Sequence, residues 1–580
     1  MKKILVSILM IFTTYLYTQE LKTDIIVIGA GGAGLSAAIE AADLGAGVII
    51  VEKMSFVGGN TIRSKGGLNA ADTSTQKKLG IIDTISDFYN DTMKGGKNIN
   101  NSELVKYLTE NSADSVEWLK SIGMNLESVG SGAGAKNPRM HRSEGGASIG
   151  GGLVKVLFEN VEKREIPILY NTQAIDLITK DNRVVGIVAE DVKTKEIYKI
   201  LGNSVVIATG GFAGNEAIYT KYREDLKGFI STNHPGADGS GILLAQKVGG
   251  DVVDMEHIQT NPTVEQNKKE VISETVRGAG AIFVNNNGER FINEMETRDK
   301  LSEAILKQNN GFVYLLFDQN LKERVKAVDE MEKINILIKG DSLEELGKKL
   351  SISPSKLSKT LYEWNNVVMS KDDKIFLRQT GLDYPIEKGP FYAIPVGPGV
   401  HHTMGGIKIN SLTNVLDKNN NIIKGLYAAG EVTGGVHGAN RLGGNAVADI
   451  IIFGRQSGRQ SVLSISKEKI IGGENTVIPL KKDFKKINPT AKPTYRDGKY
   501  IGSATGQYGK IVIETVVKNG YIDSINTLES SDTEIIYEGV EREIFPKIIY
   551  TQNLDVDMVG GATVSSRAVI SAVKKALKNK

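Results

Sequence analysis

Four polar segments, far apart in the sequence, hold the side chains best suited to chemistry. Arg298 lies in ETRDK, and ISETVRG supplies Glu274 and Arg277. Two further segments, GVHHTMGG (399–406) and HGANRLGGNA (437–446), supply a pair of histidines and a third arginine. Arginine makes bidentate hydrogen bonds to carboxylates, and glutamate and histidine exchange protons. If folding brings the four segments together, they form a site that binds a carboxylate and moves a proton.

The N-terminal part of the chain has the pattern of a dinucleotide-binding unit. TDIIVIGAGGAGLSAAIEAADLGAGVIIVEK predicts a buried parallel strand, a glycine-rich turn, a helix and a second strand. Gly29, Gly31 and Gly34 fit G-x-G-x-x-G, whose glycines let the backbone approach a pyrophosphate at the helix N-terminus. Glu52 ends the second strand, where a carboxylate binds ribose hydroxyls. The alternative is a plain glycine-rich turn, but strand, helix and acid together favour a dinucleotide site.

A second loop of small residues, SFVGGNTIRSKGGLNAA, follows soon after this acid and includes Asn60, Thr61, Gly66 and Gly67. Simple two-half NAD domains lack such a loop, so we expect FAD, whose flavin end needs a longer cradle. A surface loop is the alternative. Three later elements are expected to add contacts: a strand that could clamp adenine, the strand end in LYAAGE, and the helix N-terminus in GGNAVADIIIFG, which would point at the flavin. These contacts are Ala174, Glu431, Ala446 and Val447.

Composition excludes several other functions. The 580 residues suggest about three domains, and the formal net charge of +3 gives no reason to expect nucleic acid as a partner. Without cysteine, the chain cannot form disulfides, thiolate-ligated clusters or CxxCH haem attachments. Redox chemistry would therefore use organic cofactors or noncovalently held metals, and we predict no metal site.

The N-terminus has the pattern of a secretory signal peptide. Lys2 and Lys3 precede the apolar run ILVSILMIF, which is too short to span a bilayer. We interpret residues 1–20 as the signal peptide and expect an exported protein, periplasmic or at the cell surface. Because TYLYTQE lacks an Ala-x-Ala cleavage pattern, a buried first strand or a membrane-surface anchor is the alternative.

The order of the predicted elements indicates an α/β fold with three domains. Residues 21–254 and 391–465 are expected to form a Rossmann-like FAD-binding domain, interrupted by an inserted α+β capping domain at 255–390. A linker rich in Lys, Pro and Asn spans 466–490. Residues 491–580 are expected to form a small C-terminal α+β domain.

These motifs give the chain a resemblance to a known family. Residues 22–460 resemble the flavoprotein domain of soluble, flavocytochrome c-type fumarate reductases, within the fumarate reductase and succinate dehydrogenase superfamily. The matching segments are GFISTNHPGADG, GERFINEMETRD, GVHHTMGG and GEVTGGVHGANRLGGNA. The last ninety residues or so resemble the FMN-binding domains of quinone-reductase and Rnf-type subunits. Together, and without haem, these parts resemble urocanate reductases and related two-flavin enoate reductases.

The resemblance implies a role for each residue of the first four segments. FAD would pass a hydride to the β-carbon of an activated C=C bond, while Arg441 and His402 bind the substrate carboxylate. Arg298 would donate a proton to the α-carbon, and Glu274 and Arg277 would return a proton to it from solvent. Two further substrate contacts are implied in the same way: Ser273 and Gly444.

One end of the expected substrate pocket departs from the family pattern. Asn261-Pro262-Thr263 stands where the fumarate reductases have His-Pro-Thr, whose histidine would hold the distal carboxylate. Because asparagine is neutral and can donate or accept, the second substrate group need not be a carboxylate. Fumarate-type, urocanate-type, acrylate-type and cinnamate-type acids all remain open as substrates. His257 is a further candidate for the missing imidazole.

The C-terminal domain is expected to carry a second flavin. KIVIETVV predicts a strand and Asn519-Gly520 a hairpin turn. The segment from Asp557 to Thr563, DMVGGAT, resembles a flavinylation site, so FMN would be attached covalently to Thr563 by a flavin transferase, whereas FAD is noncovalent. A simple helix N-cap is the alternative. Electrons for anaerobic respiration would enter through FMN from a quinol-linked cytochrome or a flavin carrier, the only expected link to a membrane.

Two other interpretations remain. The chain could be an electron-transfer subunit that carries both flavins but has no small-molecule substrate. It could also be another FAD dehydrogenase, such as a 3-ketosteroid dehydrogenase or an amino-acid oxidase. The first would need no proton relay, and the second lacks the combination of Arg298, His402 and Arg441. We therefore expect an oxidoreductase that acts on CH–CH bonds.

Overall fold

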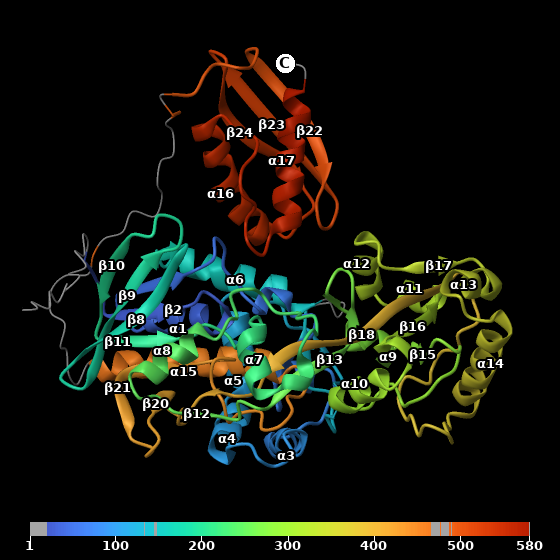
Figure 1. Ribbon diagram of the computed structural model, residues 1–580. Coiled ribbons are helices and arrows are strands. Elements are labelled where there is room, and N and C mark those ends of the chain that lie inside the picture. Colours follow the sequence, from blue (N-terminus) through green and yellow to red (C-terminus); the bar gives the residue numbers. More distant parts are fainter. Residues whose placement is uncertain are drawn as a thin grey trace, which may run out of the picture.

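The structure, a computed structural model, describes residues 20–132, 134–143, 148–465, 476, 487–488 and 490–578. All but the last residue of the predicted signal peptide, and most of the predicted linker, lie outside these residues. Figure 1 shows two regions side by side, a large sheet with its helices and a smaller cap, and the C-terminal domain lying above them. None of the helices in the described part of the chain has the length and apolar character needed to cross a membrane.

A largely parallel sheet forms the centre of the first region. Its strand order is β1-β10-β9-β21-β11-β2-β3-β7, and β2 (Ile25–Ile28) pairs in parallel with β3 (Val48–Glu52) and β11 (Ser204–Ile207). Every residue of these three strands is buried, as expected for parallel strands covered on both faces. The other strands are β1 (Glu20–Lys22), β7 (Ile168–Tyr170), β8 (Thr172–Lys180), β9 (Arg183–Asp191), β10 (Ile197–Leu201), β20 (Asn414–Leu416) and β21 (Ile422–Ala428).

Helices α1 (Gly32–Asp43) and α15 (Asn445–Ile465) pack against each other beside this sheet. Gly458 permits the close contact, because a Cβ there would lie 2.2 Å from the carbonyl oxygen of Ala37. The remaining helices are α2 (Ser74–Lys78), α3 (Ile85–Gly95), α4 (Ser102–Glu110), α5 (Ser112–Ser121), α6 (Ile149–Lys163), α7 (Glu216–Tyr222) and α8 (Ser240–Lys247). Small sheets add β4 (Leu68–Asn69), β5 (Ser128–Gly130), β6 (Met140–Arg142), β12 (Val252–Val253) and β19 (Gly406–Ile407).

The cap is built on an antiparallel sheet around one long strand, β18 (Phe391–Thr403). It pairs with β13 (Ile258–Glu265), β16 (Val313–Asp318) and β17 (Ile338–Gly340). The sequence analysis assigned residues 391–465 to the FAD-binding domain, but these pairings place the start of that range in the cap sheet. The other elements are β14 (Glu270–Val271), β15 (Ile282–Val284), α9 (Glu274–Gly278), α10 (Arg298–Leu306), α11 (Gln319–Arg324), α12 (Ala327–Lys333), α13 (Leu343–Leu350) and α14 (Pro354–Ser370).

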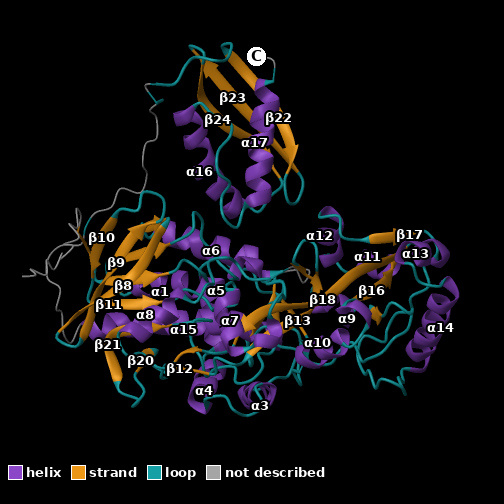
Figure 2. Ribbon diagram, viewed as in Figure 1, coloured by secondary structure: helices purple, strands orange, loops and turns teal. Residues whose placement is uncertain are grey.

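The C-terminal domain is a three-stranded antiparallel sheet with two helices on one side (Figure 2). Asn519 and Gly520 connect the second and third strands with φ angles of 54° and 79°, which confirms the predicted hairpin. A second apolar core, separate from that of the large sheet, fills the space between sheet and helices. The elements are β22 (Gly498–Thr505), β23 (Lys510–Lys518), β24 (Tyr521–Ser530), α16 (Glu534–Thr551) and α17 (Thr563–Leu577).

Candidate active site

The glycines of the G-x-G-x-x-G turn meet three different spatial demands. Gly29 has a φ of 104°, and a Cβ there would lie 2.5 Å from the carbonyl oxygen of Ala208. At Gly34 a Cβ would lie 1.9 Å from the oxygen of Gly29, so this glycine lets α1 pack on β2. A Cβ at Gly31 would meet nothing within 4 Å, because Gly31 faces an open pocket. This division of roles is the one a pyrophosphate-binding turn requires.

That first pocket fits a dinucleotide. Glu52 lies on its wall, where the carboxylate accepts hydrogen bonds from the backbone N–H groups of Ala30 (2.8 Å) and Met54 (2.9 Å), and burial raises the pKa of this carboxyl. The pocket has an open volume of about 800 Å³. One buried wall atom, Oγ1 of Thr209, has no hydrogen-bond partner among the described residues and is available to a ligand. Four of the predicted cofactor contacts line only this first pocket: Gly29, Gly31, Glu52 and Ala174.

A second pocket, of about 1060 Å³, adjoins the first. The two share four wall residues: Asn60, Thr61, Glu431 and Ile450. Predicted site residues from distant segments meet on the wall of the second pocket: Gly66, Gly67, Asn261, Ser273, Glu274, Arg298, His402, Arg441, Gly444, Ala446 and Val447. Three other predicted residues line neither pocket: Gly34, Arg277 and Thr563.

Glu274 joins two arginines at the edge of the second pocket. Arg298, the first residue of α10, donates from Nε to the Glu274 carboxylate over 2.6 Å and from Nη1 to Gln259 over 3.2 Å. Nη2 of Arg277 lies 4.0 Å from the same carboxylate oxygen of Glu274, and Arg277 is buried. The three side chains therefore form a continuous line from the pocket into the cap.

The charges in this line shift one another's pKa values. Burial raises the pKa of the Glu274 carboxyl, but Arg298 and Arg277 outweigh it and hold this pKa at about 2. Burial lowers the pKa of Arg277 to about 10, against the opposing effect of Glu274. Glu274 is therefore ionised near neutral pH, and Arg277 releases a proton more readily than a solvated arginine.

Within the described residues, His402 and Arg441 present buried nitrogens without a hydrogen-bond partner to the same pocket. Nε2 of His402 and Nε of Arg441 are buried and have no hydrogen-bond partner in the described part of the chain. Burial and the charge of Arg441 lower the pKa of His402 well below its ordinary value, so its contact with Glu431 at 3.4 Å is not an ion pair. Burial also lowers the pKa of Arg441, to about 9. A carboxylate in the pocket would give both orphaned nitrogens a partner.

Asn261 and Ser273 reach the pocket with part of their hydrogen-bonding capacity already in use. Oδ1 of Asn261 accepts from the backbone N–H of Thr263 over 3.0 Å, so its NH₂ group is the donor left for a ligand. Oγ of Ser273 accepts from the backbone N–H of Thr275 over 3.3 Å and thereby caps α9. His257 is not among the described residues that line the pocket, so its candidacy as a replacement imidazole has no support here.

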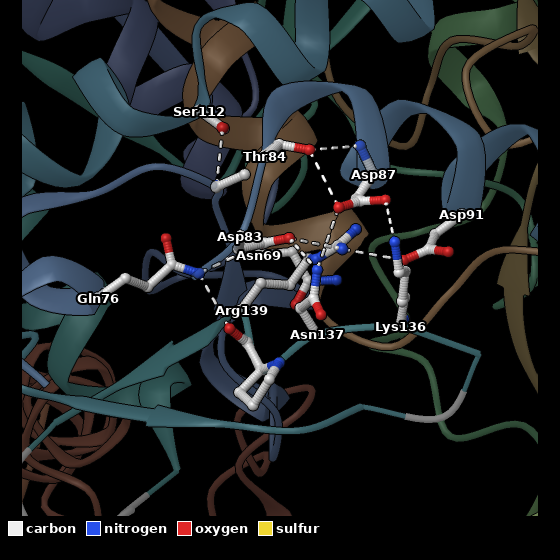
Figure 3. A network of polar contacts seen from close by, with 12 residues as sticks. Asn69, Gln76, Asp83, Thr84, Asp87, Asp91, Ser112, Lys136, Asn137 and Arg139 are labelled. Carbon is white, nitrogen blue, oxygen red and sulfur yellow. Dashed lines mark hydrogen bonds and ion pairs between the residues drawn. The ribbon is translucent and has the colours of Figure 1, made fainter. Parts of the chain in front are cut away.

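A buried polar network fixes one wall of the pocket (Figure 3). Nη2 of Arg139 pairs with Asp83 at 3.0 Å and with Asp91 at 2.9 Å, and the Arg139 side chain is almost fully buried. Arg139 directly precedes β6, whose last residue, Arg142, lines the second pocket. The network therefore anchors the strand that brings a further cation to the site.

Comparisons with known proteins decide the family. A family model described as an FAD binding domain matches residues 24–447, and one described as an FMN-binding domain matches residues 506–578. Over 438 residues the chain is 45% identical to the fumarate reductase (cytochrome) of Shewanella frigidimarina, with 76% of each chain covered. The chain belongs to the FAD-binding fumarate reductase family.

Other members of the family agree with this assignment. An NADH:fumarate oxidoreductase of Klebsiella pneumoniae is 46% identical over 439 residues, which cover 76% of this chain but 47% of that protein, about half its length. A flavocytochrome c3 fumarate reductase in an open conformation superposes with a TM-score of 0.67 at 42% identity, covering 77% of this chain and 78% of that one. The predicted family and fold class are confirmed: this is a fumarate reductase-like oxidoreductase acting on CH–CH, with FAD-binding and FMN-binding domains.

Sequence reasoning missed three residues of this fumarate reductase-like site: Arg142, Gln259 and His401. Gln259 accepts from Arg298 and donates from Nε2 to the backbone oxygen of Arg441 over 2.8 Å, so it links both arginines. Its spacing of two from Asn261, on what the structure shows to be β13, is the signal that could have found it. Arg142 and His401 line the pocket, and only the tertiary fold brings Arg142 there.

The FMN-binding domain presents Thr563 as the first residue of α17, with an exposed side chain. The N–H groups and dipole of a helix N-terminus favour a phosphate, so the position fits the phosphoester of an attached FMN. The preceding turn contains Gly561, whose φ is 81°. This backbone conformation explains a glycine directly before the Ala-Thr pair.

Proposed function

We propose that this protein reduces the C=C bond of a small α,β-unsaturated carboxylate, with fumarate as the first candidate and electrons entering through FMN. The fumarate reductase relatives support the reaction class. One observation carries the proposal for this chain. The Arg298–Glu274 contact lies on the same pocket as the unsatisfied Nε2 of His402 and Nε of Arg441, where that pocket joins the FAD pocket.

In this proposal, Arg441 and His402 bind the carboxylate next to the double bond. Arg441 contributes the charge-assisted hydrogen bond, and the neutral His402 contributes Nε2–H as a second donor. Bound FAD supplies the hydride. Both donors stabilise the negative charge that reaches the carboxylate oxygens during the reaction, and both side chains are buried.

Arg298 is the proposed proton donor. Its Nε and Nη1 are held by Glu274 and Gln259, which leaves Nη2 as the nitrogen free to face the substrate. Nη2 points toward Gly443, where a Cβ would lie 3.8 Å from it. Since Glu274 is ionised, it passes a proton from Arg277 to Arg298 rather than storing one. The lowered pKa of Arg277 makes that guanidinium a usable acid in the line.

The second group of the substrate would meet Asn261 and Arg142. The NH₂ of Asn261 is a neutral donor, and Arg142 donates from Nη1 to the hydroxyl of Thr275 over 3.1 Å while lining the pocket. Both recognise a hydrogen-bond acceptor, which a distal carboxylate and an imidazole nitrogen each supply. Fumarate and urocanate are therefore the two substrates to compare.

The electron supply forms the second part of the proposal. FMN would be attached to Thr563 by a flavin transferase after export, and would receive electrons from a quinol-linked cytochrome or a flavin carrier during anaerobic respiration. The exposed Thr563 at a helix N-terminus supports the attachment. The lysines and apolar run at the N-terminus support export to the periplasm or cell surface.

The test is anaerobic reoxidation of reduced viologen by the purified flavoprotein, with fumarate, urocanate, acrylate and cinnamate run in parallel. We expect turnover with at least one acid, and with fumarate first. Arg298→Ala is the matched negative control. Reoxidation by none of the four acids would contradict the proposed reaction.

A further inference from the structure

The loop formed by residues 53–57 contacts two different parts of the molecule. It follows Glu52 directly, and Glu52 and Lys53 line the FAD pocket. On the other side, Phe56 belongs to the buried apolar cluster that forms the core of the FMN-binding domain. Phe56 is only 2% exposed, so the FMN-binding domain is its main cover. A residue of one domain thus completes the core of another.

Two glycines of the FMN-binding domain receive this ring. On α16, a Cβ at Gly539 would lie 2.7 Å from Cβ of Phe56. In the turn before Thr563, a Cβ at Gly561 would lie 3.2 Å from Cζ of Phe56 and 2.8 Å from Nε2 of His234. At both positions a larger residue would push the domain away from the loop.

His234 is the point where this contact reaches the FAD pocket. Its ring stands edge-on to Phe56 with centroids 5.4 Å apart, and it lines the first pocket. Burial lowers the pKa of His234 to about 3, so the ring is neutral, and Nε2 has no hydrogen-bond partner among the described residues. One side chain therefore touches both the turn that precedes Thr563 and the wall of the FAD site.

Polar contacts surround the Phe56 anchor. Nη1 of Arg542 donates to the backbone oxygen of Ser55 over 3.0 Å, and its guanidinium lies 4.2 Å from the ring centroid of Tyr170. Farther out, Lys155 on α6 pairs with Glu534 at 2.5 Å. The remaining rim contacts join Glu543 to Asn171 and Lys193. A buried aromatic anchor inside a polar rim is the anatomy of a specific interface.

We propose that Phe56 locks the FMN-binding domain in one docked position, with the turn before Thr563 against His234, and that docking and FAD binding stabilise each other through Lys53–Val57. The stabilisation is reciprocal because one short loop contributes to both sites. The electron path rests on the proposed function: two electrons and two protons leave reduced FMN and enter FAD across this contact, and an external two-electron reductant reduces FMN again.

Cross-linking of the full-length holoenzyme tests the docked position. Because the chain has no native cysteine, only the introduced cysteines can react. Lys155→Cys and Glu534→Cys replace two exposed, facing side chains and would be joined by a short bis-maleimide. The control combines Lys155→Cys with Lys499→Cys. Lys499 is near the start of β22, and this end of the strand is the one farther from the FAD-binding domain (Figure 1). We expect an intramolecular product from the first pair alone, and equal products from both pairs would overturn the proposal.

Gly539→Leu tests the anchor itself. Leucine is a better helix former than glycine, so the change favours α16 but leaves no room for Phe56. We expect cross-linking to slow by about tenfold and FAD to dissociate about fivefold faster, a typical size for coupling between sites. Phe56→Ala alone should also slow cross-linking, because it removes the anchor, whereas Tyr550→Leu, at an exposed position of α16, should change neither quantity. Unchanged cross-linking and FAD release in Gly539→Leu would refute the coupling.

Viologen turnover separates this proposal from the proposed function. A chain that cross-links as expected but reduces no enoate would refute the function and leave the docking intact. A chain that reduces fumarate from viologen but does not cross-link would refute the docking alone.

Discussion

The cap contains two arginine–carboxylate clusters that look alike in sequence and differ in what they leave unsatisfied. Arg290 and Arg298 are eight positions apart. Arg290 pairs with Glu294 at 2.9 Å and with Asp373 at 3.0 Å, and Arg378 pairs with Glu294 at 2.9 Å. No buried nitrogen or oxygen of these four side chains lacks a partner among the described residues. The Arg298–Glu274–Arg277 line instead leaves Nε of Arg277 unpaired and borders the second pocket.

The difference separates a structural cluster from a reactive one. The first cluster is saturated and also holds Arg277 in place, because Arg378 donates to the backbone oxygen of Arg277 over 2.6 Å and Nη1 of Arg277 donates to the backbone oxygen of Glu294 over 2.6 Å. Among the described residues, the second has spare donors: Nη2 of Arg298 at the cavity and the buried Nε of Arg277. Residue types are alike in the two, but the side chains of Arg298 and Glu274 are 14% and 18% exposed whereas those of Arg378 and Glu294 are fully buried, so free hydrogen-bonding capacity at a pocket is the property that marks chemistry.

The largest expected effect is in the reactive cluster. Arg298→Ala removes the proposed acid, and kcat for fumarate should fall by about 10³, within the range for general acid catalysis. Thermal unfolding should change little, because Arg298 lies at a pocket edge. Steady-state viologen assays give kcat, and calorimetry gives the stability. A variant that keeps a tenth of the wild-type kcat would remove the distinction between the clusters.

Glu274→Gln should lower kcat by about 10², since an amide cannot pass a proton to Arg298. The substitution keeps the shape of the side chain, so the substrate KM should stay within about twofold. The solvent isotope effect on kcat provides the check, because it should rise when proton delivery becomes limiting. An unchanged kcat would show that Glu274 belongs with the structural cluster.

Arg290→Met should have the opposite effect, a loss of stability without a loss of activity. It leaves the buried Asp373 without its ion-pair partner and Glu294 with Arg378 alone, which costs about 3–5 kcal/mol of unfolding free energy. Activity per folded molecule should stay near the wild-type value, since Arg290 does not line the pocket. Urea unfolding and active-site titration measure the two quantities. A selective loss of kcat in a stably folded variant would contradict the assignment.

A smaller effect should appear in the pH dependence of the end of the pocket that binds the reacting carboxylate. Arg441 has a pKa of about 9, so its charge is present below that pH and is lost as pH rises through it. We expect kcat/KM for fumarate to fall about tenfold per pH unit above this value. Because burial holds the pKa of His401 and His402 well below the ordinary value, no second limb should appear near pH 6.5. A clear limb there would contradict a neutral His402.

The sequence predicted much of this arrangement because its signals are local. The dinucleotide turn, the hairpin at Asn519-Gly520 and the four polar segments are each readable in a short stretch. What it missed depends on long-range packing: the placement of β18 in the cap sheet, the approach of Arg142 to the pocket, and the insertion of Phe56 into another domain. Residue type and spacing alone could not separate Arg290 from Arg298, since both lie in one charged run; the family resemblance singled out Arg298, and the pocket distinguishes the two in the structure.

The most direct test of the central claim is a single-turnover experiment on the protein with its FAD already reduced by dithionite. Rapid mixing with fumarate should reoxidise the flavin in the wild type and in Arg290→Met, at rates within about threefold, and about 10³ times more slowly in Arg298→Ala. Equal rates in the wild type and Arg298→Ala would contradict the role of Arg298 as the proton donor.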